Sequence, residues 1–262
     1  MSFHLNHGPI ALTIRAIWFT ALVLFALALV PLVPIFGQRT ADVARWWFGL
    51  ALRALGVSLA VNGDIPAKPT VIVANHCSWL DILVLGHVFR ASFISKEEVK
   101  RWPVAGRLAR ATGTLFLPRG AGQTQAIGEQ IRATLAENRS VVLFPEATTA
   151  RSPVPARFHA RLFAAAIDEG FDVLPVAVRY TDDHTPADQH LAPVPWVDMP
   201  LWPNFVAVFR LKALRARVQI CDTVTSMGLD RRGLAEASRQ AIVYQQQRDS
   251  APNRVNEPAA TS

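Results

Sequence analysis

His76 and Asp81, five positions apart, are the residues of this sequence best placed for acid–base chemistry. They follow a short apolar run that ends at Ala74, and Asp81 falls in the first turns of the helix predicted next. A histidine is the natural general base because its pKa lies near neutrality. An aspartate that bonds the other imidazole nitrogen would fix the tautomer and stabilise the imidazolium, as in the His–Asp half of a catalytic triad.

The nucleophile of such a triad is missing from the sequence. No G-x-S-x-G motif occurs, and Cys77 and Ser78 lie too close to His76 along the chain to be assumed in line with it. A dyad without its own nucleophile suits a direct transfer, in which the hydroxyl of a substrate attacks. By itself, the same spacing also fits an aspartate that caps a helix beside an unrelated histidine.

Three further patterns place a polar or unusual residue in or after an apolar strand. Arg119 closes one apolar run, where its guanidinium could hold an oxyanion, although a solvated arginine in a turn also fits. Glu146 closes a second run, where it could hold a hydroxyl or a neighbouring arginine, or be an ordinary acid at a strand end. Pro175 interrupts a third run, which predicts a bulge or a strand edge there.

The composition is that of a folded chain with a basic balance. Of its 262 residues, 51% are hydrophobic and 18% are charged, which excludes a disordered chain, and charges recur too often for a polytopic membrane protein. The net charge of +7 indicates a polyanionic partner, which could be nucleic acid, an anionic membrane surface or a phosphorylated substrate. Cys77 and Cys221 are far apart, so neither a disulfide framework nor a zinc site is expected, and a reducing compartment is the default.

The N-terminal region predicts attachment to a membrane. The stretch 16–37 carries no charge, and about 20 apolar residues cross a bilayer. Two prolines within it favour a kink, so a hairpin that dips into the membrane, with 41–60 as its return arm, is an alternative to a spanning helix. Trp46 and Trp47 stand in that arm where an interfacial aromatic belt would form.

Beyond about Val61, short β-rich runs alternate with helical stretches. This alternation argues for an α/β fold, a single layered domain with a mixed sheet flanked by helices. We expect a membrane anchor over 1–60, a catalytic domain over 61–248 and a disordered tail over 249–262. Strands are predicted at 70–74, 92–95, 114–117, 140–144, 173–178 and 217–221, and helices at 79–89, 104–112, 124–137, 157–168 and 231–247.

Together, in this order and spacing, these patterns resemble the glycerolipid acyltransferase family, typified by lysophosphatidic acid acyltransferases and including a lyso-ornithine-lipid branch. The resemblance covers residues 40–245, and its ordered set of motifs is specific. The family motifs N-H-x4-D, G-x-(L/I)-F-(I/L)-x-R, F-P-E-G-T-R-S and V-x-P-V-A fall on Asn75, His76 and Asp81; Gly113, Phe116 and Arg119; Phe144, Pro145, Glu146 and Thr148; and Val173, Pro175, Val176 and Ala177.

The resemblance implies a membrane-bound bacterial O-acyltransferase of phospholipid metabolism. His76 would take the proton of a lipid acceptor's hydroxyl, which attacks the thioester of acyl-CoA or acyl carrier protein, and Asp81 would orient the histidine. Neither a metal nor a cofactor beyond this co-substrate is expected. The active site would face the cytoplasm from the inner membrane, against an anionic membrane surface. The substrate-binding residues implied are Asn75, Gly113, Phe116, Arg119, Glu146, Thr148, Thr149, Arg151 and Pro175.

The departures from the family pattern concern the acceptor. Ala147 stands where the family has glycine, and Thr149 stands where it has arginine, with Arg151 two residues later. A threonine in that position is frequent in the lyso-ornithine-lipid branch. Because most of the motif set matches, we expect 1-acylglycerol-3-phosphate as the acceptor, giving phosphatidic acid, with lyso-ornithine lipid as the alternative.

Two other classes of function have less support. A basic nucleic-acid-binding module would rest on charge alone, so no nucleic acid is expected as a partner. A metal hydrolase using His76, Asp81 and His87 would lack a clustered ligand set. The apolar and aromatic segment 201–212, flanked by cations, is a candidate second membrane contact, and a core-packed helix is the other interpretation.

Overall fold

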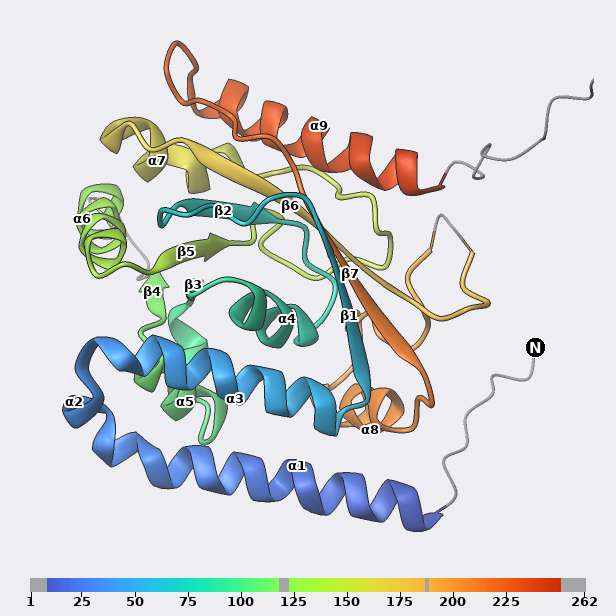
Figure 1. The fold of residues 1–262 in the computed structure, drawn as a ribbon. Coiled ribbons are helices and arrows are strands. Elements are labelled where there is room, and N and C mark those ends of the chain that lie inside the picture. The colour runs from blue at the N-terminus through green and yellow to red at the C-terminus, as the bar shows by residue number, and fades with distance from the viewer. Residues whose placement is uncertain (1–8, 118–122, 187–188, 251–262) are drawn as a thin grey trace, which may run out of the picture.

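The computed structural model of the protein describes residues 9–117, 123–186 and 189–250 (Figure 1). Of the tail predicted at 249–262, the first two residues form the end of α9, and the rest lies outside the described residues. The strands are β1 (Val57–Asn62), β2 (Val71–Ala74), β3 (Ala91–Lys96), β4 (Leu115–Leu117), β5 (Ser140–Leu143), β6 (Val173–Thr181) and β7 (Leu214–Ile220). The α-helices are α1 (Pro9–Leu29), α2 (Val33–Phe36), α3 (Thr40–Ala54), α4 (Leu80–Val88), α5 (Ala105–Ala111), α6 (Gln123–Ala136), α7 (Ala164–Glu169), α8 (Leu201–Phe209) and α9 (Arg231–Ser250).

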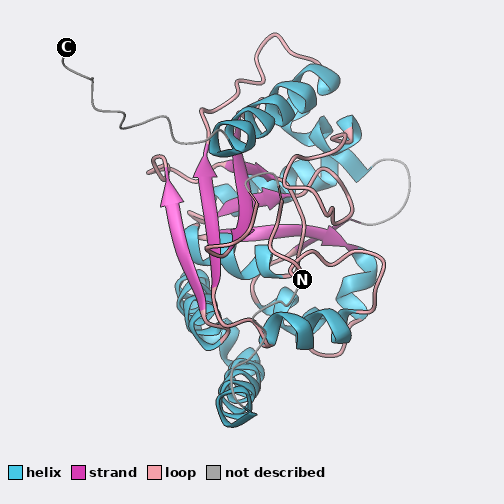
Figure 2. Ribbon diagram, turned by 90° about the vertical axis from the view of Figure 1, so that its right-hand side faces the viewer, coloured by secondary structure: helices cyan, strands magenta, loops and turns pink. Residues whose placement is uncertain are grey.

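The described strands form one mixed sheet, as predicted, in the order β1-β7-β6-β2-β5-β3-β4. Neighbouring strands are parallel except β6 and β7, which run antiparallel. Helices cover both faces of the sheet (Figure 2). One apolar core includes residues of α3, α4 and α8, and a second includes residues of α6, α7 and α9. The alternation of strands and helices along the chain therefore gives a layered α/β domain.

The two central strands, β2 and β6, carry the site. All four residues of β2 are buried, as its unbroken apolar run requires when helices cover both faces. β6 lies between β2 and β7 and is buried along its whole length. Of the two alternatives predicted at Pro175, a bulge or a strand edge, the strand edge is therefore wrong. The carbonyl of Pro175 accepts from the amide of Cys221 just beyond the β6–β7 ladder, which begins at Val176. The missing N–H of the proline therefore falls where that ladder ends.

The N-terminal segment folds as a helical hairpin. α1 runs antiparallel to α3 along one side of the molecule, and a turn containing α2 joins them (Figure 1). Within the described part of the chain, one helical stretch, Leu12–Phe36, is long and apolar enough to cross a membrane by length and composition. The indole Nε1 of Trp47 donates to the carbonyl of Leu22 at 2.8 Å, so the return arm bonds directly to α1.

Arg15 fastens α1 to the rest of the chain. Its guanidinium donates to the carbonyls of Ala54 and Leu55 at the end of α3, and to that of Leu211 after α8. The last carbonyls of a helix lack partners within it and are satisfied by such donors. The guanidinium also lies over the ring of Phe209, 6.0 Å from its centroid. α1 therefore packs as part of the domain.

Two further predictions are refined by the structure. The boundary expected between residues 60 and 61 falls inside β1, which pairs with β7 along its whole length. The segment predicted either as a membrane contact or as a packed helix contains α8. Its Phe205 meets Phe19 of α1 edge to face at 5.3 Å, while Trp202 is 71% exposed. α8 thus has a packed side and an exposed tryptophan.

Candidate active site

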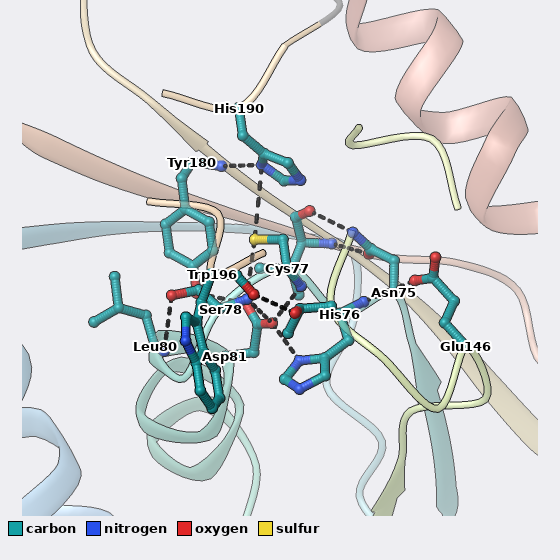
Figure 3. Close-up of polar contacts among 12 residues, drawn as sticks. Asn75, His76, Cys77, Ser78, Leu80, Asp81, Glu146, Tyr180, His190 and Trp196 are labelled. Carbon is teal, nitrogen blue, oxygen red and sulfur yellow. Dashed lines mark hydrogen bonds and ion pairs between the residues drawn. The ribbon is translucent and has the colours of Figure 1, made fainter. Parts of the chain in front are cut away.

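The turn between β2 and α4 carries His76 and leads to Asp81 at the carboxyl end of a central strand (Figure 3). Such strand ends are where open α/β sheets form their sites. The amide of Ala150 donates to the carbonyl of His76, and the amide of Trp196 donates to the carbonyl of Cys77, each at 2.8 Å. Two loops from distant parts of the chain therefore fix the position of this turn.

Asp81 is fully buried and accepts hydrogen bonds on both carboxylate oxygens. Its Oδ2 accepts from Nδ1 of His76 at 2.7 Å and from the amides of Cys77 and Ser78 at 2.8 and 3.0 Å. Its Oδ1 accepts from the hydroxyl of Tyr180 at 2.7 Å. Burial acts to raise the pKa of Asp81, but these bonds, led by that of His76, hold the pKa below its ordinary value. The carboxylate therefore stays ionised beside the imidazole.

The imidazole of His76 faces an apolar cavity of about 420 Å³. It stacks on the ring of Phe144 with centroids 4.1 Å apart, and its side chain is 19% exposed. Because Nδ1 donates to the carboxylate, Nε2 is the nitrogen left to accept a proton. The sequence prediction that Asp81 reaches back to His76 is confirmed as a contact.

The cavity lies between the N-terminal hairpin and the catalytic dyad. Its walls are apolar residues of α1, α3, α4 and α5, among them Ala26, Trp47, Leu83 and Leu108. Besides the tryptophans, the lining residues with polar side chains are His76, one serine and three threonines. Such a cavity can hold an extended apolar chain with its reactive end at the histidine.

Glu146 lies next to His76, but the backbone uses its carboxylate. Oε1 accepts from the amide of His76 at 3.0 Å, and Oε2 accepts from the amide of Ala156 at 3.1 Å. Burial raises the pKa of Glu146 above its ordinary value, although these two bonds oppose the shift. The glutamate therefore ties the histidine turn to the loop that follows β5, and its part in holding the acceptor stays a prediction.

Asn75 lies behind the dyad. Its side-chain amide pairs with the backbone of Val178 on β6, donating to the carbonyl at 2.9 Å and accepting from the amide at 2.8 Å. Both ends of the amide are thus used to join the end of β2 to β6. Pro175 lies on the same buried strand. These contacts position the turn, and the substrate-binding role implied for both residues stays a prediction.

The second motif lies partly outside the described residues. Gly113 has φ +76°, a left-handed conformation that favours glycine, and a Cβ there would meet the guanidinium of Arg139. Phe116 lies in β4, with Nζ of Lys100 over its ring at 5.8 Å. Arg119 is outside the described residues, so its predicted contact with the acceptor's anionic group stays a prediction.

Thr149 and Arg151 are both directed to the segment that follows residue 195. The hydroxyl of Thr149 donates to the carbonyl of Trp196. The guanidinium of Arg151 donates to the carbonyl of Val197 at 3.3 Å and lies 3.7 Å from the carboxylate of Asp198. The substrate-binding roles implied for Thr149 and Arg151 stay predictions.

Ala147 holds the turn that the family builds with glycine. Its φ is 57°, in the left-handed region, which costs a non-glycine residue about 1–2 kcal/mol. The turn after β5 therefore carries backbone strain at this position. The neighbouring Thr148 is exposed.

Tyr180 and Trp196 complete the site and were missed by sequence reasoning. Tyr180 lies on β6, 99 positions from Asp81 along the chain. Trp196 lies in an irregular segment, and its backbone contacts both Cys77 and Thr149. No motif or spacing marks either residue, because only the sheet order and the loop path bring them to the dyad.

A second histidine, His190, is buried behind the dyad. Its Nδ1 accepts from the amide of Tyr180 at 3.2 Å and lies 4.0 Å from Sγ of Cys77, while its Nε2 has no partner among the described residues. Burial lowers the pKa of His190 to about 4, and burial raises the pKa of Cys77 well above its ordinary value. Both groups are therefore neutral at pH 7, and Cys77 is not an activated nucleophile.

The structure also bears on the metal-site alternative. Across the described ranges, no group of three or more His, Cys, Asp or Glu side chains could hold a metal ion. His87 lies on α4 with its Nδ1 3.1 Å from the carbonyl of Arg45 on α3. Its contacts belong to the packing of the hairpin.

Comparisons with known proteins identify the family of the chain. Residues 58–179 match the family model described as Acyltransferase. The chain is 37% identical to a lyso-ornithine lipid O-acyltransferase of Pseudomonas aeruginosa, over 76% of each chain. It is 34% identical to a 1-acyl-sn-glycerol-3-phosphate acyltransferase of Neisseria gonorrhoeae, over 73% of this chain and 76% of that one.

A solved structure has the same fold. The crystal structure of the 1-acyl-sn-glycerophosphate acyltransferase PlsC of Thermotoga maritima matches with a TM-score of 0.63, at 19% identity, over 92% of this chain and 98% of that one. The sheet, the dyad and the two bacterial relatives lead to one assignment. The chain belongs to the acyltransferase family, and it is an enzyme of the lysolipid-acylating type.

Proposed function

We propose that the protein transfers a fatty acyl group from acyl-CoA or acyl carrier protein to the free hydroxyl of lyso-ornithine lipid. 1-Acylglycerol-3-phosphate is the second candidate acceptor. The observation that carries the proposal is the imidazole of His76, which faces an apolar cavity while Asp81 holds its Nδ1. A base on an apolar cavity suits a reaction between an acyl chain and a lipid hydroxyl.

The transfer is direct, with His76 as the general base. Its Nε2 takes the proton of the acceptor's hydroxyl as that oxygen attacks the thioester carbonyl, so a C–O bond forms and the C–S bond breaks. The imidazolium returns the proton to the leaving thiolate. Asp81, ionised and fully bonded, orients the ring and stabilises its positive charge during the step.

The charges at the motif that the family has as F-P-E-G-T-R-S favour the acceptor that carries less negative charge. A phosphate monoester carries more negative charge and is best held by several bidentate, charge-assisted bonds from guanidinium groups. A single carboxylate needs one such bidentate guanidinium, which we call a fork. Thr149 offers no cation, and Arg151 is directed to Val197 and Asp198. The Pseudomonas aeruginosa relative, a lyso-ornithine lipid O-acyltransferase, supports this order. The number of matching motifs favours 1-acylglycerol-3-phosphate as the first candidate acceptor, and the proposal reverses that order.

A specific comparison keeps 1-acylglycerol-3-phosphate as the second candidate. The Neisseria gonorrhoeae relative, which is named for that acceptor, is nearly as similar to this chain as the Pseudomonas protein. Both acceptors present a free hydroxyl beside an acyl chain, so the dyad and the cavity would serve either. The acceptor's head group is what separates the two candidates.

We place the enzyme on the cytoplasmic face of the inner membrane. Ile14, Trp18 and Phe25 of α1 are exposed, which suits a helix in contact with lipid. Other residues of the same hairpin line the cavity. A lipid chain would therefore pass from the bilayer into the cavity without crossing water.

The test is an acceptor panel. The purified enzyme in detergent micelles is assayed with labelled palmitoyl thioester and with lyso-ornithine lipid or 1-acylglycerol-3-phosphate at matched concentrations. A higher kcat/KM on lyso-ornithine lipid is expected. A preference for 1-acylglycerol-3-phosphate would reverse the acceptor assignment, and transfer to neither would reject the function.

Two variants test the reason for the preference. Arg151→Ala should leave transfer to lyso-ornithine lipid unchanged. If Arg151 instead holds a phosphate, the variant loses about 10-fold in kcat/KM on 1-acylglycerol-3-phosphate, the effect of one charged hydrogen bond. Thr149→Arg should raise transfer to 1-acylglycerol-3-phosphate relative to lyso-ornithine lipid. Arg157→Ala, at an exposed arginine of the same loop, is the matched control.

A further inference from the structure

A second concave surface, which we call the basic hollow, lies between the 3₁₀ turn Glu97–Arg101 and α5. Its volume is about 490 Å³. Four cations line it, together with one tryptophan and one acid: Lys100, Arg101, Arg107, Arg110, Trp102 and Glu97. None of these residues belongs to the acyltransferase motifs.

The positive charge of the basic hollow is only partly neutralised. Lys100 pairs with Glu97 at 3.2 Å, and Arg110 donates to the backbone carbonyl of Lys100. Arg101 and Arg107 are exposed, and neither has a hydrogen-bond or ion-pair partner in the part of the chain that the structure describes. Two free guanidinium groups therefore face solvent at a concave surface, where they could hold a phosphate.

The shape of the hollow depends on the close approach of α5 to the 3₁₀ turn. Gly106, in the first turn of α5, is buried, and its amide donates to the carbonyl of Trp102 at 3.0 Å. A Cβ at this position would meet the carbonyl oxygens of Lys100 and Val99 at 2.5 and 2.6 Å. Any larger residue would push the turn away, so the glycine keeps the cations of both elements around one space.

Trp102 connects the basic hollow to the catalytic cavity. Its side chain lines both spaces, and its ring meets that of Trp196 edge to face at 6.5 Å. A ligand with an anionic group in the hollow could pass over Trp102 and place an apolar end in the cavity that His76 faces. Such a ligand would first meet the cations of the basic hollow, then the indole of Trp102, then the apolar walls of the cavity, and finally His76.

We infer that the basic hollow binds the phosphate groups of the acyl donor, at the end of its phosphopantetheine arm. The inference rests on the proposed function. A lyso-ornithine acceptor has one carboxylate and needs one fork, so four cations exceed its need. The donor has phosphate at one end of the arm and the acyl thioester at the other, which matches the path from hollow to cavity. Acyl-CoA and acyl carrier protein share this arm.

The test is the double variant Arg101→Ser/Arg107→Ser. We expect the KM for the acyl donor to rise about 10-fold or more, from the loss of charged hydrogen bonds, with kcat and the acceptor KM unchanged. The affinity for free CoA, measured by calorimetry without any acceptor, should fall by a similar factor. Arg101→Lys/Arg107→Lys should recover part of the affinity, since it restores the charge without the fork.

The matched control is Arg231→Ser/Arg232→Ser at the start of α9. These two arginines are exposed and lie across the sheet from α5 (Figure 1). The control removes the same charge as the test variant and should leave donor KM and CoA affinity unchanged. An equal loss in the control would overturn the inference, because it would reduce the effect to net charge.

Two donors identify the source of the phosphate. A loss with both palmitoyl-CoA and palmitoyl carrier protein supports recognition of the shared arm, and a loss with one of them assigns the hollow to that donor. The inference is overturned if the acceptor KM rises instead. It is also overturned if the double variant loses only binding to vesicles of phosphatidylcholine and phosphatidylglycerol, since the hollow would then be a membrane contact. CoA binding without transfer to any lysolipid would reject the proposed function alone.

Discussion

The hydroxyl of Tyr180 donates to Oδ1 of Asp81 at 2.7 Å, on the carboxylate oxygen that His76 does not use. Tyr180 lies on β6 and Asp81 on α4, so the bond joins the middle of the sheet to the helix that carries the dyad. Burial raises the pKa of Tyr180 well above its ordinary value, so the hydroxyl keeps its proton and remains a donor. The tyrosine thus holds the carboxylate in the orientation that meets the imidazole.

Tyr180→Phe should lower kcat about 10-fold with little change in either KM, because a hydrogen bond to a charged group contributes about 1.5–3 kcal/mol. Losing this bond also raises the pKa of Asp81, so the deficit should grow as the pH falls. Steady-state kinetics across the pH range measure both effects. Tyr244→Phe, at an exposed tyrosine of α9, is the control. A wild-type kcat would mean that the amides of Cys77 and Ser78 suffice to orient Asp81.

His76→Ala should reduce transfer by about 10²–10⁴-fold, the usual contribution of a general base. Asp81→Asn should also be severe, because the amide cannot stabilise the imidazolium. Single-turnover assays measure the chemical step, and membrane association should persist in both variants. His159→Ala, at an exposed histidine, should be silent. If His76→Ala kept more than about a tenth of the rate, His76 would not be the general base.

Arg15→Met should destabilise the protein by about 2 kcal/mol, because it removes a charged donor from three backbone carbonyls. Methionine keeps the apolar stem of the side chain, so α1 should still attach to the membrane. Urea unfolding in detergent micelles measures the change. Arg53→Met, at an exposed arginine of α3, is the matched control. Equal unfolding midpoints for the two variants would show that α1 is held by apolar packing alone.

His190→Asn should make the free energy of unfolding fall less than in the wild type when the pH is lowered. The pKa of the buried histidine is about 4, against 6.5 when it is exposed. Between these values the unfolded chain binds the proton and the folded chain does not, so stability falls as the pH falls through this window. Between pH 7 and pH 5 the loss is about 2 kcal/mol.

Urea unfolding at several pH values compares the two proteins. Asparagine does not titrate and keeps an acceptor for the amide of Tyr180, so the variant should retain more of its stability at pH 5. Parallel curves for wild type and variant would assign the acid sensitivity to other groups.

The pairing of His76 with Asp81 and the layered α/β fold could both be predicted from the amino-acid sequence. The bonds that Asp81 accepts from His76, Cys77 and Ser78 are local, so the spacing allows this contact, and the ordered set of motifs favours it over a capping aspartate beside an unrelated histidine. Strands such as β2 and β5 could be predicted because their apolar runs are short and unbroken. The hairpin was one of two interpretations of the N-terminus, because its length and hydropathy suit either a spanning or a returning helix.

The distant residues that support the dyad become visible only in the folded chain. Tyr180 reaches Asp81 because β6 lies beside β2, and the order of strands in a sheet is not written in local spacing. β1 was missed since it is half-exposed and gains its stability by pairing with β7, far along the chain. The basic hollow likewise depends on how closely Gly106 lets α5 approach the preceding turn. Contacts within one turn follow from local backbone geometry, whereas contacts between segments depend on the packing of the whole chain.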